Sequence, residues 1–393
     1  NKINVMSKLI YLDNSATSFP KPDVVYDFMN SFYRTKGVSP GRSGFDAALE
    51  AEDVVNNTRK ILTKLFNGGV DHNRLTFSYN ATDSINLIIN GLVENGIHVV
   101  TTLLEHNSVL RPLYMHQQAG TIDVTYVPFD PLTGYVDPDD IKKAIKENTK
   151  FVIVTHCSNV LGTIQPLAEI GKICKDKGVI FVVDGSQGAG AVDFDMQACN
   201  ADVYCFTGHK CLMGPTGIGG SYVREGIDIK HTRAGGTGVR SAYPGHLEEY
   251  PYRLEYGTLN ILGVAGLYAG VKWITEQGIM KIHNREVELW DKLRRELQQI
   301  EGVTTYCATS KVNKNPVLSF NIRGFEAGDV GTMLDVDYGI AVRTGLQCAP
   351  KVHQHIGTAD IHGTVRMSVG AFNTEEDINA AISAVKEIAA LKN

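Results

Sequence analysis

Seven short apolar runs alternate with amphipathic stretches between residues 75 and 223. Several runs are nearly continuous and rich in β-branched residues, a pattern typical of strands buried on both faces. In one amphipathic stretch, Leu167, Ile170 and Ile173 recur at helical spacing. Strands that alternate with helices predict an α/β fold with a doubly wound, mostly parallel, seven-stranded sheet. The expected strands are Leu75–Tyr79, His98–Thr102, Ile122–Val127, Phe151–Thr155, Val179–Val183, Val203–Phe206 and Ile218–Val223.

Beyond Tyr256 the regular alternation ends, and the mixture of helices and short strands predicts a smaller α+β domain. The expected elements are helices at about 263–277 and 280–300, strands at 316–322 and 364–369, and a last helix from near Thr374. The expected division is an N-terminal segment along the site (1–21), a large domain (22–256) and a small domain (257–393).

Composition and charge exclude several classes of protein. The net charge of -5, without a basic block, argues against nucleic-acid binding, and no apolar run approaches the roughly 18 residues of a membrane span. Asn1–Met6 lacks a signal-peptide pattern, and seven cysteines without a C-x-x-C pair favour a reducing, cytoplasmic location. No ligand pattern completes a metal site around His353 and His355, so we expect no metal and interpret this segment as loop.

A carboxylate and a lysine follow two successive apolar runs. Asp184 comes directly after Val179–Val183, and Lys210 lies four residues beyond Phe206. The carboxyl ends of parallel strands form the ligand-binding edge of such sheets. A lysine can hold the aldehyde of pyridoxal phosphate, and an aspartate can keep its ring nitrogen protonated. A surface lysine or a helix-capping aspartate explains either residue alone, but the pair predicts the cofactor.

Other polar residues follow the expected strands. The segment Asn80–Asp83 precedes a helical run and suits a phosphate, although an ordinary turn with Thr82 or Asp83 as N-cap is equally consistent. His106 can stack on the pyridine ring or be an ordinary loop residue. Asn159 can hold the cofactor's phenolic oxygen or a substrate carboxylate, and Gln187 can reach the same phenolic oxygen.

The C-terminal part contributes a cysteine and an arginine. Cys348 lies between a glycine and a proline, and an exposed loop cysteine near Arg343 is a candidate reactive thiolate. We expect Cys174 and Cys205, in contrast, to be buried and inert. Arg366 lies on an expected strand and suits an α-carboxylate, although a surface ion pair is an equally good interpretation of this residue alone.

Taken together, these segments resemble the class V aminotransferase family of fold-type-I pyridoxal phosphate enzymes. Within it they are most similar to the group II cysteine desulfurases and selenocysteine lyases. The resemblance runs nearly end to end, and its order of motifs is specific. The motifs are Tyr11–Thr17, Glu105–Ser108, Ser158–Thr163, Val183–Gln187, Gly208–Lys210 with Gly214–Gly217, Glu255–Asn260, Ala341–Gly345 with Cys348-Ala349, and Arg366–Ser368.

The resemblance implies roles for the matching residues. Lys210 would bind the cofactor aldehyde and move the Cα proton, and Cys348 would attack the substrate sulfur. The substrate would be L-cysteine, or L-selenocysteine in a lyase, bound through Asn159, Arg343 and Arg366. The other cofactor contacts would be Asp184 at the ring nitrogen, His106 on the ring, Gln187 at the phenolic oxygen, and Ala81, Thr82, Thr207 and His209 at the phosphate.

The resemblance also implies partners. Gly257 and Thr258 would reach the phosphate of a neighbouring subunit, which implies a homodimer with shared sites. The short spacing from Arg343 to Cys348 is similar to group II, whose members usually pass the persulfide to a separate acceptor protein. Three departures bear on substrate and acceptor: Leu346-Gln347 in place of histidines, the unusual turn Gly235–Ser241, and Leu259 in place of proline.

Three alternatives to a cysteine desulfurase stay open on the sequence. The first is a selenocysteine lyase, for which Cys348 matters less because the C–Se bond is weaker. The second is transamination or another β-elimination on the same fold. The third is a partner-binding protein that has kept the fold, against which the intact Lys210 and Asp184 argue.

Overall fold

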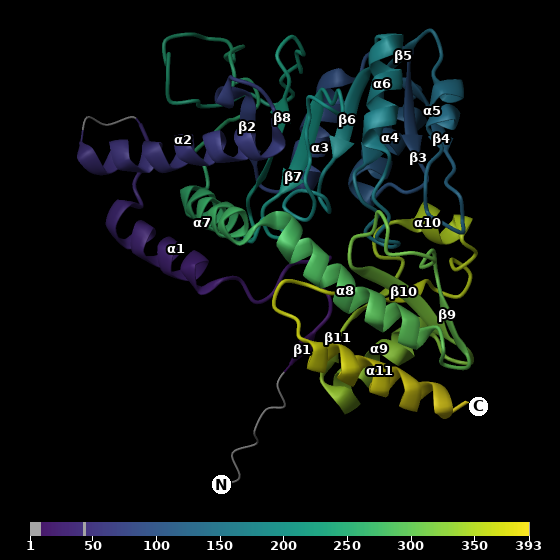
Figure 1. Ribbon diagram of the computed structural model, residues 1–393. Helices are drawn as coiled ribbons and strands as arrows, with labels where there is room; N and C mark the ends of the chain where they lie inside the picture. The colour runs from purple at the N-terminus through teal and green to yellow at the C-terminus, as the bar shows by residue number, and fades with distance from the viewer. Residues whose placement is uncertain (1–8, 42–44, 393) are drawn as a thin grey trace.

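The computed structural model describes residues 9–41 and 45–392 and has the predicted seven-stranded sheet at its centre (Figure 1). Residues 1–8, which include most of the expected start of the N-terminal segment, lie outside the described part. The strand order is β2-β8-β7-β6-β5-β3-β4, and β8 alone runs in the direction opposite to the other six strands. These strands are β2 (Leu75–Ser78), β3 (Ile97–Thr102), β4 (Ile122–Val127), β5 (Thr149–Thr155), β6 (Ile180–Asp184), β7 (Val203–Thr207) and β8 (Gly219–Val223). The α/β prediction is confirmed.

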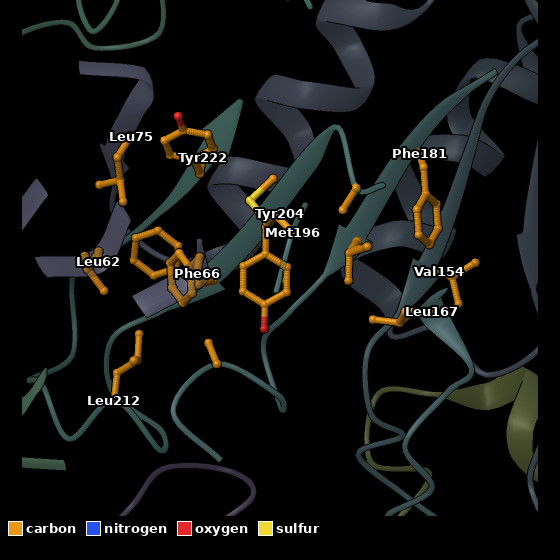
Figure 2. Packing of buried hydrophobic residues seen from close by; sticks show 14 of the residues in the cluster. Leu62, Phe66, Leu75, Val154, Leu167, Phe181, Met196, Tyr204, Leu212 and Tyr222 are labelled. Atoms are coloured by element: carbon orange, nitrogen blue, oxygen red, sulfur yellow. The ribbon is translucent and has the colours of Figure 1, made fainter. Parts of the chain in front are cut away.

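Helices cover both faces of the sheet because its strands alternate two sets of buried side chains. On one face, Ile153 packs in a cluster with helices α3 (Ala81–Leu92) and α4 (Asn107–Gln118). On the other, Val154 packs in a cluster with α2, α6 and α7. Figure 2 shows this second core, where the rings of Phe66 and Tyr204 lie 4.9 Å apart between centroids. The helices of this face are α2 (Asp46–Phe66), α6 (Leu167–Lys177) and α7 (Ile261–Gln277).

A second, antiparallel sheet of order β12-β13-β10-β9 forms the core of the smaller α+β part, as predicted. Its cluster contains Trp290 of α8 and Ile378 of α11. The two helices lie side by side (Figure 1). A capping box at Thr374 begins α11, at the position where the sequence predicts the start of the last helix. The elements are α8 (Ile279–Leu297), β9 (Val303–Thr305), β10 (Val317–Ile322), α9 (Ala327–Tyr338), β12 (Arg343–Gly345), β13 (Thr364–Ser368) and α11 (Glu375–Ala390). The division at residue 257 stays a prediction, and α7 shares the core of the large sheet.

The described part of the chain begins with a short strand outside the two larger sheets. This strand, β1 (Ile10–Tyr11), pairs with β11 (Ile340–Ala341) before the chain enters α1 (Asp23–Lys36). The remaining elements are η1 (His72–Arg74), α5 (Pro138–Ala144) and α10 (Pro350–His355). The last of these corrects the expected loop at His353–His355: Pro350 presets the first helical residue, and Val352 is buried in the core. Across the described residues, no helix combines the length and apolarity that a membrane crossing requires.

Candidate active site

The predicted site residues meet in one cavity of about 290 Å³ at the carboxyl ends of the parallel strands. Twelve of the fourteen candidates line it, although they come from both parts of the chain. They are Ala81, Thr82, His106, Asn159, Asp184, Gln187, Thr207, His209, Lys210, Arg343, Cys348 and Arg366. Gly257 and Thr258 line a second cavity of about 310 Å³. Their role at a neighbouring subunit therefore stays a prediction.

Asp184 and Lys210 reach the cavity from adjacent strands. Asp184 is the last residue of β6, and Lys210 lies three residues beyond the end of β7, its parallel neighbour. The Asp184 Oδ1 atom accepts hydrogen bonds from the amide and hydroxyl of Ser186, at 3.0 and 2.5 Å. Burial lowers the pKa of Lys210 to about 8, and the nearby Asp184 carboxylate opposes this shift. The lysine can therefore be a neutral amine near physiological pH.

One end of the cavity fits a phosphate group. Thr207 Oγ1 and His209 Nδ1 are buried there and have no hydrogen-bond partner among the described residues. Ala81 and Thr82 begin α3, whose first amides lack acceptors within the helix. The N-cap is Asn80, which accepts from the Asp83 amide at 2.9 Å, and not Thr82 or Asp83 as considered above. Orphaned donors and a helix N-terminus together suit the phosphate of pyridoxal phosphate.

The middle of the cavity fits an electron-poor aromatic ring. His106 is the N-cap of α4, and its Nδ1 atom accepts from the Ser108 amide at 3.0 Å. Burial and the neighbouring Lys210 lower the pKa of His106 to about 4, so its ring is neutral. Gln187 Nε2 donates to the Ser15 carbonyl oxygen at 2.9 Å, which ties it to the N-terminal segment. A neutral imidazole in the same cavity as Asp184 suits a pyridine ring whose nitrogen carries a proton.

The residue before His106, Glu105, is a completely buried carboxyl group. Glu105 Oε1 accepts from the Thr102 hydroxyl at 2.7 Å and from the Thr155 amide at 3.0 Å. Complete burial raises the pKa of Glu105 to about 8, and the nearby Asp184 adds to the shift. Glu105 is therefore largely protonated at neutral pH, whereas Asp184 is the acidic side chain that lines the cavity.

Arg366 lines the cavity with a guanidinium that has two partners. Its Nη2 atom contacts Asp13 Oδ1 at 2.6 Å, and its Nη1 atom donates to the Asn159 carbonyl oxygen at 3.0 Å. The Nε atom is buried and without a partner within the described ranges. Arg366 is only 3 % exposed, so the interpretation as a surface ion pair is wrong. A buried guanidinium with spare donors can bind a carboxylate.

Cys348 is exposed in the loop between β12 and α10, as expected, and lines the same cavity. Its carbonyl oxygen accepts from the Asn107 amide at 2.7 Å. Cys174 and Cys205 are buried, as predicted, and burial raises the pKa of the Cys174 thiol to about 12. Cys348 is therefore the thiol that combines exposure with access to this cavity.

Several residues in the cavity, or in contact with its lining, were not singled out from the sequence. Asp13, for example, pairs with Arg366 across most of the chain, and the only local signal for it is its place in the segment Tyr11–Thr17. Gln347 was noted only as a departure from the family pattern. The additional lining residues are Ser15, Ala16, Asn80, Ser108, Thr155, Cys157, Ser186 and Gln347.

Comparisons with known proteins identify the family of this chain. The profile of the family "Aminotransferase class-V" matches residues 10–381. A probable cysteine desulfurase of Methanothermobacter thermautotrophicus is 33% identical over 97% of this chain and 95% of its own. A cysteine desulfurase of Escherichia coli O157:H7 is 31% identical over 97% and 93%. Among solved structures, the apo cysteine desulfurase of Thermococcus onnurineus matches with a TM-score of 0.89 and 33% identity over 98% and 95% of the two chains.

Family members of this kind use pyridoxal phosphate, the cofactor for which the cavity has a phosphate end, a ring position and a lysine. The match of the profile covers both sheets and every one of the twelve residues that line the cavity. The chain therefore belongs to the class V aminotransferase family, whose members are pyridoxal phosphate enzymes.

Proposed function

We propose that this enzyme is a cysteine desulfurase that converts L-cysteine to L-alanine and collects the sulfur as a persulfide on Cys348. The single observation that carries the proposal is the exposed Cys348 thiol in the same cavity as Lys210 and Arg366. An enzyme that only moves protons or amino groups has no need for such a thiol. The names of the relatives at 31% and 33% identity support the same reaction.

The cofactor residues have distinct proposed tasks. Thr207, His209 and the first amides of α3 hold the phosphate, and Lys210 holds the aldehyde. Asp184 keeps the ring nitrogen protonated, while the neutral His106 ring packs against the cofactor face. Pyridoxal phosphate, when bound, withdraws electrons from the substrate and makes its Cα proton acidic.

The substrate residues orient L-cysteine between the two catalytic groups. Arg366, with Asn159 and Arg343, binds the α-carboxylate, because a guanidinium matches a carboxylate in charge and geometry. Lys210, as a neutral amine, takes the proton from Cα. Orientation by Arg366 places this proton toward Lys210 and leaves the side-chain sulfur toward Cys348.

The sulfur step belongs to Cys348. Its thiolate attacks the substrate sulfur, and an S–S bond forms as the Cβ–S bond breaks. The electron pair of the broken bond stays on Cβ, which takes up a proton and becomes the methyl group of alanine. L-cysteine and one enzyme thiol thus give L-alanine and one enzyme persulfide, with no external oxidant.

The wider context of the enzyme follows from the same proposal. Gly257 and Thr258 line a separate cavity and do not reach the phosphate end within one subunit. In a homodimer, these residues of one subunit would contact the phosphate end of the other. The exposure of Cys348 suits transfer of the persulfide to an acceptor protein. Free cysteines, one of them exposed, favour the reducing cytoplasm.

Replacement of Cys348 by Ala tests the proposal against a selenocysteine lyase. We expect the variant to lose release of sulfur from L-cysteine, with alanine formation reduced at least about 100-fold. Cys199→Ala, at a half-buried cysteine outside the cavity, is the matched control and keeps full activity. Unchanged desulfuration of cysteine by Cys348→Ala contradicts the proposal. Activity confined to selenocysteine in the wild type and the variant alike identifies a lyase instead.

A further inference from the structure

The loop that carries Cys348 has two consecutive residues in an unusual backbone conformation. Gln347 and Cys348 have φ angles of 41° and 59°, in the left-handed region that few residues other than glycine adopt. Gln347 is 5 % exposed, whereas the adjacent Cys348 is exposed. Such a backbone persists only where the surrounding structure fixes it. The contacts of Gln347 therefore identify what holds Cys348 in place.

The side chain of Gln347 is anchored in the small sheet and in α10. Its Nε2 atom donates to the Thr364 carbonyl oxygen at 2.8 Å, and its Oε1 atom contacts His353 Nε2 at 2.8 Å. Burial lowers the pKa of His353 to about 4, so the ring is neutral and carries one proton. Because Oε1 is an acceptor, that proton is on Nε2, and His353 Nδ1 accepts from the Thr358 hydroxyl at 2.8 Å. Each polar side-chain atom of Gln347 and of His353 thus has at least one hydrogen-bond partner.

The main chain of the same loop is anchored in the large domain. Asn159 Nδ2 donates to the Gln347 carbonyl oxygen at 2.7 Å, and the Asn107 amide donates to the Cys348 carbonyl oxygen at 2.7 Å. The carbonyl oxygen of Asn159 in turn accepts from Arg366 Nη1 at 3.0 Å. The loop is thus connected to the arginine proposed to bind the substrate carboxylate.

We propose that Gln347 is a positioning residue for sulfur transfer, which fixes the loop so that the Cys348 thiol faces the substrate sulfur. The inference rests on the proposed desulfurase function. Lys210 belongs to a different segment, three residues beyond the end of β7, so we expect proton removal to depend on this loop less than attack by Cys348 does. Loss of the anchor therefore slows attack by Cys348 and leaves proton removal intact. A merely structural role of Gln347 predicts no such separation.

Two variants test this, Gln347→Ala and Gln347→Glu, the second of which keeps the size of the side chain. A glutamate carboxylate cannot donate to the Thr364 carbonyl oxygen, so it breaks the anchor without a cavity. Gln354→Ala, at an exposed glutamine of α10, is the matched control. The holoenzymes are compared in single turnovers for two rates: persulfide formation on Cys348 from L-cysteine, and exchange of the L-alanine Cα proton with heavy water.

The expected result is a loss of roughly 10- to 100-fold in persulfide formation in both Gln347 variants. Proton exchange stays within about twofold of the wild type, and Gln354→Ala changes neither rate. Unchanged persulfide formation overturns the inference, and so does an equal fall in both rates. If the wild type forms no persulfide from L-cysteine, the proposed function itself is overturned. If the wild type and both Gln347 variants form it at the same rate, only the inference about Gln347 is overturned.

Discussion

Asp13 and Arg366 form an ion pair with a 2.6 Å contact, although 353 residues separate them in the chain. The pair joins the N-terminal segment to β13 and holds the guanidinium at the cavity, where we propose that it binds the substrate carboxylate. Asp13 contacts Nη2, while Nη1 reaches the Asn159 carbonyl and the buried Nε has no partner in the described part of the chain. The arginine is therefore oriented before substrate arrives.

Arg366→Lys is expected to raise KM for L-cysteine by at least about tenfold. Lysine keeps the charge but cannot contact Asp13, Asn159 and a carboxylate with one planar group. Steady-state kinetics of the holoenzyme measure the effect, and the visible absorption of the cofactor shows that its site is intact. Arg295→Lys, on the exposed face of α8, is the control. An unchanged KM excludes Arg366 as the carboxylate ligand.

Asp184→Asn is expected to lower kcat by at least about 100-fold while the protein still folds. An amide cannot keep the ring nitrogen protonated, so the electron-withdrawing power of the cofactor falls. The Ser186 donors that bond Oδ1 can still bond the amide oxygen. Steady-state kinetics with L-cysteine check this prediction, and a kcat within about threefold of the wild type contradicts the role of Asp184.

The pKa of Lys210 predicts how proton removal depends on pH. Burial lowers this pKa to about 8, and only the neutral amine accepts a proton. In the Cys348→Ala variant, which isolates the proton step, exchange of the Cα proton of L-alanine should rise with pH and level off above about 8. Exchange followed in heavy water by NMR measures this profile. A rate that keeps rising to the usual lysine pKa of 10.5 contradicts it.

Glu105 predicts a pH dependence of stability. Its folded pKa is about 8, raised by burial from an ordinary value of 4.5. Between these values the folded protein keeps a proton that the unfolded chain has released, so this group lowers stability as the pH rises through the window. Glu105→Gln removes this titration, and the difference in thermal midpoint, variant minus wild type, should therefore increase from pH 5 to pH 8.

Other buried carboxyl groups, such as Glu286, titrate equally in both proteins and cancel in this difference. The exposed Glu296→Gln is the control, for which we expect no change with pH. If Glu105→Gln and wild type keep the same difference at both pH values, the buried carboxyl does not titrate as described.

The strands of the large sheet and two residues of the candidate site, Asp184 and Lys210, could be predicted from local sequence. The strands of the large sheet are apolar runs, so their positions followed from periodicity, and Asp184 and Lys210 followed from the ends of two of them. The partners of Arg366 could not be found in this way. They come from segments whose meeting depends on how two sheets pack, which leaves no local pattern.

The same limit applies to the cysteine loop. Exposure of Cys348 could be predicted from its neighbours, but the left-handed backbone of Gln347 depends on buried bonds to His353, Thr364 and Asn159. The helix at His353–His355 was missed because a six-residue segment shows too little periodicity, and its start depends on Pro350. The sequence alone does not reveal hydrogen-bond networks between residues that lie far apart in the chain.

The most direct measurement is the mass of the Cys348 peptide after one turnover of the holoenzyme with L-cysteine, together with the alanine released. Because Cys348 and Lys210 line the same cavity, we expect one added sulfur atom on this peptide and one alanine for each active site. Alanine without added sulfur on Cys348, or a keto acid in place of alanine, would contradict persulfide formation on this residue.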